Sequence, residues 1–188
     1  MPKQYIEVKP LTDFEDVLGY EFKNKELLWQ SLTHKSAISE GHPMACHNDL
    51  SALAFLGDAA LKYAVTRYLI LNGRDEVAKN CVELHNNTQK ILPDLILANI
   101  ARDKLHIEEY LIRGNAQRTP STKMYASCME AILGAIALDC GTDQQGLLFR
   151  VIEKLCSDRY DTLLIPDTTF RFVSAFDFRG NDDEDDAP

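Results

Sequence analysis

The stretch LSALAFLGDAALKYAV, Leu50–Val65, decides the fold. Its first twelve residues are nearly all apolar, and Asp58 is their only charged residue. The apolar residues recur at helical spacing as far as Leu71, and the Asn72-Gly73 pair that follows is typical of a helix end. The pattern predicts a long helix that is buried on most sides and yet carries one carboxylate.

A second stretch, ASCMEAILGAIAL at Ala126–Leu138, has the same character, with Glu130 as its only charge. Each stretch also contains a glycine, Gly57 in the first and Gly134 in the second. An interior glycine costs a helix about 1 kcal/mol relative to alanine. Both glycines are explained if the two helices pack backbone to backbone, which would bring Asp58 and Glu130 close together.

The two carboxylates predict a site for a divalent cation. At about 4 Å, two carboxylates repel each other by roughly 4 kcal/mol at an effective dielectric constant of about 20. Mg²⁺ removes this repulsion, because it takes oxygen ligands and is often held by one or two carboxylates together with substrate phosphates, and Mn²⁺ can substitute for it. The alternative is structural, with Asp58 paired to Lys62 and Glu130 bonded to a loop amide. Taken jointly, the two acids favour the metal.

The rest of the chain predicts an all-α fold, since helical spacing recurs and alternating stretches are scarce. We assign residues 1–165 to one helical domain, and residues 166–188 to a tail that is first aromatic, then acidic, and partly disordered. Pro93 is tolerated if a helix begins there. The predicted helices span residues 13–18, 24–36, 50–71, 76–85, 88–104, 107–113, 122–138 and 143–163.

Composition argues against several classes of protein. The sequence has neither an apolar run long enough to span a membrane nor the pattern of a signal peptide, so we expect an intracellular protein without a membrane partner. Its five cysteines are scattered and form no C-x-x-C pair, which indicates reduced thiols rather than disulfides or zinc ligands. The net charge of −9 argues against a polyanionic partner, but five acids lie in the run DDEDD at 182–186.

One internal segment is locally basic. Between Glu109 and Glu130 there is no acid, and Arg113, Arg118 and Lys123 are present. These three residues are the candidates for contacts with phosphates of a partner. An ordinary solvated loop accounts for the same charges equally well.

Four blocks of the sequence resemble ribonuclease III, the family of double-stranded RNA endonucleases. FLGDAAL, Phe55–Leu61, is similar to the core of the family signature, NERLEFLGDAVL, and MEAILGAIALDCG, Met129–Gly141, is similar to the second motif, FEALIGAIYLDGG. LGYEFKNKELLWQSLTHKSA resembles the opening helices, and ILPDLILANIARDKLHIEEYLIRGNA resembles the segment before the second motif. With order and spacing matched, the resemblance covers about Leu18–Leu164.

The resemblance implies an all-α, ribonuclease III endonuclease-like domain that forms a homodimer along the signature helix, with Phe55 at the interface. It also implies that Asp58 and Glu130 are catalytic residues holding Mg²⁺, which activates water to attack the phosphodiester bonds of double-stranded RNA. Many members append a double-stranded-RNA-binding domain, and the residues after Pro166 are neither long nor basic enough to form one. The nuclease domain is then expected to bind RNA alone, with a partner, or as a fragment of a longer protein.

The chain departs from the family pattern where most of the acids lie. The glutamates expected four and seven residues before the aspartate are Ala54 and Ser51, and the aspartate expected three residues before Glu130 is Ser127. Ser51 and Ser127 become candidates for supporting contacts around the metal. The Mini-III subgroup also has alanine and a hydroxyl residue at two of these positions and cleaves RNA, whereas other relatives have lost the acids and serve as RNA-binding scaffolds.

Three hypotheses follow from the sequence. The first is a Mg²⁺-dependent homodimeric endonuclease that acts on double-stranded RNA. The second is a catalytically inactive member of the same fold that binds structured RNA or joins a ribonucleoprotein, and the third is a helical interaction protein whose two acids are satisfied internally. The first is favoured, because a scaffold would be free to replace a costly buried acid with an apolar residue.

Overall fold

The computed structural model describes residues 5–72, 80–91 and 93–164, and within these ranges the regular structure is helical, with one isolated β-bridge between Thr33 and Ile112. The all-α prediction is therefore confirmed. Short 3₁₀ and π turns connect some of the helices. The α-helices are α1 (Leu11–Leu18), α2 (Lys25–Ser31), α3 (Lys35–Glu40), α4 (Ser51–Asn72), α6 (Cys81–Ile91), α7 (Asp94–Asn99), α8 (Thr122–Cys140) and α9 (Gln145–Leu164).

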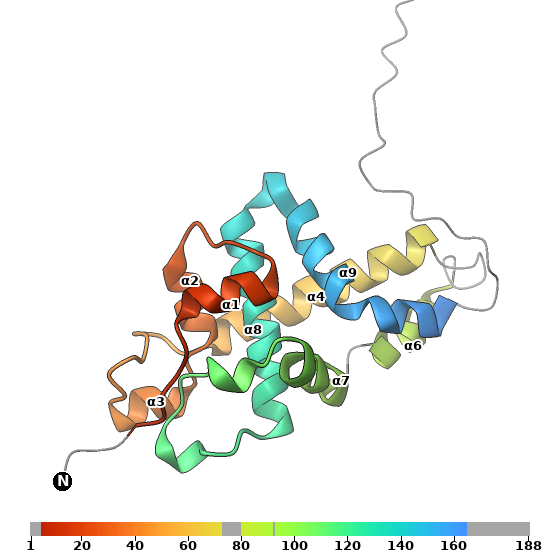
Figure 1. Cartoon of the computed structure of the whole chain (residues 1–188). Coiled ribbons are helices and arrows are strands. Elements are labelled where there is room, and N and C mark those ends of the chain that lie inside the picture. Colours follow the sequence, from red (N-terminus) through yellow and green to blue (C-terminus); the bar gives the residue numbers. More distant parts are fainter. Residues whose placement is uncertain (1–4, 73–79, 92, 165–188) are drawn as a thin grey trace, which may run out of the picture.

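Helix α8 forms the centre of the molecule. Figure 1 shows it running through the middle of the fold, and it contacts α2, α4, α7 and α9. Its side chains are buried along most of its length. The helix begins at a capping interaction in which the Ser121 hydroxyl accepts a hydrogen bond from the Met124 N–H. The nearly continuous apolar sequence of α8 therefore reflects burial on several sides.

Helices α4 and α8 touch through their backbones at the two glycines. A Cβ atom built on Gly57 would overlap the main-chain carbonyl of Glu130, and one built on Gly134 would overlap the carbonyl oxygen of Leu53. No side chain larger than hydrogen fits at either position without moving a helix. The prediction of backbone-to-backbone packing is confirmed, and this contact fixes where α4 crosses α8.

Helix α4 is buried on one face only. Leu53, Gly57 and Leu61 face the core, whereas the side chains of Phe55 and Tyr63 on the opposite face are 84% and 57% exposed. The prediction of a helix buried on most sides is therefore wrong for the single chain. An apolar pattern indicates a preference for burial, but it does not say whether the same chain provides the cover.

The predicted helix at residues 24–36 is interrupted and forms α2 and α3. The connecting residues pair with a distant segment, because the Ile112 N–H donates to the Leu32 carbonyl and the Ile112 carbonyl accepts from the His34 N–H. The His34 ring then caps α3 by accepting a hydrogen bond from the Ser36 N–H. A partner almost eighty residues away is invisible to local periodicity, so the break could not be predicted.

The other predicted helix boundaries agree with the structure to different degrees. Pro93 immediately precedes α7, as expected for a helix start. The predicted break between residues 85 and 88 does not exist, since α6 continues through it. The predicted helix start at residue 76 and the tail at residues 166–188 lie outside the described residues. None of the described helices is long and apolar enough to cross a membrane.

Candidate active site

Asp58 and Glu130 meet where α4 crosses α8. Gly57, the neighbour of Asp58, lies against the main chain of Glu130, so the close packing of the helices sets the approach of the two acids. Glu130 is half-buried and Asp58 is exposed. Among the described residues neither acid forms an ion pair, and Lys62 does not reach Asp58. The alternative in which Lys62 pairs with Asp58 and a loop amide binds Glu130 is therefore not supported, since the described residues include no such partner for either acid.

The environment of Glu130 disfavours its charged form. Burial is the largest cause and raises the pKa of Glu130, and the negative charges of Asp58 and Asp94 raise it further, while Lys123 acts in the opposite direction. The surroundings thus favour either a proton on Glu130 or a cation beside it. A divalent cation would neutralise both Asp58 and Glu130 at once.

A third carboxylate approaches the pair from α7. Asp94, the first residue of α7, forms an ion pair of 3.2 Å with Lys123 on α8. The sequence reasoning missed Asp94, because its proximity to Glu130 arises from the packing of α7 against α8. In the described part of the chain, no group of three or more His, Cys, Asp or Glu side chains is arranged to hold a metal ion. The candidate metal ligands are therefore the Asp58 and Glu130 pair.

A cavity of about 310 Å³ lies at the beginning of α8, one helical turn before Glu130. It brings together Ser51 from the first turn of α4 and Ser127, which lies one turn before Glu130 on α8. The two serines thus line one cavity, although neither Asp58 nor Glu130 lines it. The cavity is lined by His34, Lys35, Leu50, Ser51, Gln117, Ser121, Lys123, Met124 and Ser127.

The three basic candidates for RNA contacts have different environments. Arg113 is only 4% exposed, and its guanidinium group donates hydrogen bonds to the main-chain carbonyls of Glu108 and Arg118. Its role is to hold the loop together, so the expectation that it contacts phosphates is corrected. Arg118 and Lys123 are exposed and stay as candidates.

Residues 24–154 match the family model described as Ribonuclease-III-like. This chain belongs to the ribonuclease-III-like family. Among curated members, it is 32% identical over 158 residues to Ribonuclease 3 of Caldanaerobacter subterraneus, covering 82% of this chain and 65% of that protein. It is also 32% identical over 142 residues to Ribonuclease 3 of Oceanobacillus iheyensis, covering 73% of this chain and 59% of that protein.

Solved structures of the ribonuclease III family agree with the sequence matches. The nuclease domain of ribonuclease III from Campylobacter jejuni superposes with a TM-score of 0.64 at 29% identity, covering 77% of this chain and 97% of that domain. A second structure of the same nuclease domain gives a TM-score of 0.63. The chain spans less than two thirds of the length of the curated relatives, and the part it shares with the Campylobacter protein is the nuclease domain.

Proposed function

We propose that this chain is a Mg²⁺-dependent endoribonuclease that cleaves double-stranded RNA, with Asp58 and Glu130 as its catalytic, metal-holding residues. The observation that carries the proposal is the pair itself. The glycine contact between α4 and α8 holds two carboxylates together without a basic partner from the described residues. The family membership supplies the class of substrate.

The residues present fit a hard dication with few protein ligands. The pKa of Glu130 is raised by burial and by the charge of Asp58, so a cation at this position relieves an existing repulsion. Mg²⁺ commonly takes one or two protein carboxylates, keeps several waters and contacts substrate phosphates. When bound, it would lower the pKa of a water molecule and neutralise negative charge at a phosphodiester. Asp58 and Glu130 would hold it, and Ser51 and Ser127 would support the surrounding water.

The remaining parts of the site position the substrate. Asp58 is exposed, so a duplex can approach it from solvent, whereas Glu130 is anchored in the central helix. Arg118 and Lys123 lie on the loop and on the first turn of α8, where they can contact the RNA backbone. Duplex RNA is recognised largely through its shape and phosphates, so a few exposed cations are a suitable means of recognition.

A second candidate function is an inactive member that binds structured RNA or serves as a ribonucleoprotein component. It is favoured by the absence of three family acids, at Ser51, Ala54 and Ser127. Incubation of the protein with long duplex RNA, with and without Mg²⁺ or Mn²⁺, separates the two. Metal-dependent shortening of the RNA supports the nuclease, and binding without shortening supports the scaffold.

We also propose that the protein forms a homodimer through the open face of α4. Phe55 is 84% exposed, and Tyr63 two turns later is 57% exposed although its ring lies 5.8 Å from that of Phe149, so most of this apolar strip on α4 stays exposed in the single chain. One of the Campylobacter structures concerns a region involved in dimer formation of that nuclease domain. We propose a second copy of this chain as the partner that covers this strip, because most soluble oligomers are symmetric homo-oligomers.

Replacing Phe55 with aspartate is expected to weaken the dimer at least about thirtyfold, because an aromatic side chain at the centre of an interface commonly contributes 2 kcal/mol or more. Light scattering after gel filtration over a range of concentrations measures the effect. Leu95→Asp is the matched control, since Leu95 is an exposed apolar residue on α7 rather than α4. A wild-type protein that stays monomeric at high concentration contradicts the proposal.

A further inference from the structure

The cavity at the beginning of α8 is lined by basic, neutral polar and apolar residues. Its lining contains two lysines, a histidine, a glutamine amide and three serine hydroxyls, and no aspartate or glutamate. The whole chain carries a net charge of −9, yet no acid lines this cavity. Its volume of about 310 Å³ is ample for a tetrahedral oxyanion with some of its water.

The lining groups come from three separate elements that the fold holds together. Lys35 belongs to the first turn of α3, Ser51 to the first turn of α4, and Lys123 and Ser127 to α8. The ion pair with Asp94 tethers Lys123 while leaving its side chain 69% exposed. The lysine ammonium groups and the hydroxyls are all able to donate hydrogen bonds.

His34 adds a donor whose proton position follows from its hydrogen bonds. Its Nδ1 accepts from the Ser36 N–H and also contacts the Ser36 hydroxyl. In the neutral ring the proton therefore resides on Nε2, which is left to donate. Burial and the neighbouring Lys35 lower the pKa of His34, while Asp49 opposes them, so the ring is neutral at pH 7 and keeps this donor.

We infer that this cavity is a phosphate-binding pocket, formed by Lys35, Lys123, His34 and the serine hydroxyls. Resting on the proposed function, its occupant is a backbone phosphate of the RNA strand that lies along the carboxylate pair. Ser51 and Ser127 stand where the family pattern places acids, and an acid there would repel a phosphate. Their replacement by hydroxyls removes two negative charges from the edge of the metal site, so this edge can accept a phosphate.

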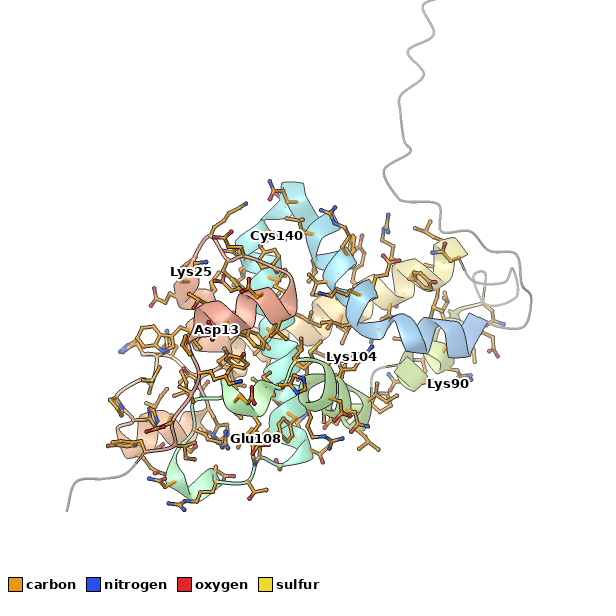
Figure 2. The ribbon with its side chains drawn as sticks, in the orientation of Figure 1. Asp13, Lys25, Lys90, Lys104, Glu108 and Cys140 are labelled. Atoms are coloured by element: carbon orange, nitrogen blue, oxygen red, sulfur yellow. The ribbon has the colours of Figure 1, made fainter. Side chains whose placement is uncertain are left out.

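The first test uses inorganic phosphate and metal-free protein at pH 7, with the imidazole signals of His34 followed by NMR. A saturable shift is expected in the wild type. Lys35→Ala is expected to weaken the affinity about tenfold, because it removes a charged hydrogen-bond donor. Lys90→Ala is the matched control, since Figure 2 places Lys90 on α6, away from α3. No saturable shift, or an equal loss in both variants, overturns the pocket.

Two substitutions at Ser127 test whether a negative charge in the cavity prevents phosphate binding. Ser127→Asp introduces a carboxylate and is expected to abolish phosphate binding. Ser127→Asn introduces an uncharged amide of the same shape as that carboxylate, and is expected to keep phosphate binding within about threefold. Equal phosphate binding by these two variants overturns the pocket. Circular dichroism confirms that both variants are folded.

The second test distinguishes a failure of the RNA-phosphate assignment from a failure of the proposed nuclease function. Binding of duplex RNA is measured without metal over a range of salt concentrations, where Lys35→Ala should weaken binding and reduce the slope of log affinity against log salt by about 1. The Lys90→Ala variant should retain the wild-type slope. Phosphate binding with no effect of Lys35→Ala on RNA overturns the assignment to RNA, and a wild type that does not bind duplex RNA overturns the proposed function itself.

Discussion

Asp58→Asn is expected to lower Mg²⁺-dependent cleavage of duplex RNA by at least about a hundredfold. Asparagine keeps the shape of the side chain but removes the charge that holds the cation, and a metal supplies several kcal/mol of stabilisation to a phosphoryl transition state. Asp58 is exposed and makes no ion pair with a described residue, so the substitution leaves the core untouched. The measurement is the initial rate of cleavage of long duplex RNA at saturating Mg²⁺.

The matched control is Asp16→Asn. Asp16 is an exposed aspartate on α1, so it undergoes the same chemical change away from the site. It should retain the wild-type rate within about twofold, in line with a surface substitution. A rate for Asp58→Asn equal to that of the control would show that the cleavage, if any, does not depend on the carboxylate pair.

Gly57→Ala is expected to destabilise the protein by about 3 kcal/mol or more, enough to unfold a marginal domain. Helix propensity alone predicts the opposite, a gain of about 1 kcal/mol. The added methyl group would overlap the carbonyl of Glu130, which is main chain and cannot rotate away, so α4 must separate from α8. Thermal and urea unfolding followed by circular dichroism measure the change.

Gly41→Ala is the control for the general effect of replacing a glycine. Gly41 adopts φ +70 and has open space around its missing Cβ, so its substitution introduces backbone strain without a clash. A loss of about 1 kcal/mol is expected there. If Gly57→Ala is as stable as Gly41→Ala or more stable than the wild type, the close packing of α4 on α8 is wrong.

The helical architecture and the glycine contact between α4 and α8 could be predicted from the sequence, because both depend on local signals. The apolar helix with Asp58 was predicted at residues 50–71 and is observed at Ser51–Asn72. The pairing of Gly57 with Gly134 followed from the cost of a glycine inside a helix, since that cost needs a compensating contact. These inferences required no knowledge of distant partners.

The features that the sequence could not provide arise from tertiary packing. The break before α3 depends on hydrogen bonds to Ile112, and the approach of Asp94 to Glu130 depends on α7 packing against α8. Arg113 looked like a surface cation, yet its guanidinium group is buried against main-chain carbonyls. Charge and residue type predict chemistry, but only the packed fold decides which groups meet solvent.

The most direct test of the site is the binding of Mn²⁺ to RNA-free protein, measured by calorimetry or electron paramagnetic resonance. Binding by the wild type is expected, with affinity falling as the pH is lowered through the raised pKa of Glu130, because protons then compete with the cation. Asp58→Asn and Glu130→Gln should each weaken Mn²⁺ binding at least about tenfold, whereas Asp16→Asn should not change it. Equal affinities in all four proteins, or no binding by the wild type, would contradict the assignment of Asp58 and Glu130 as metal ligands.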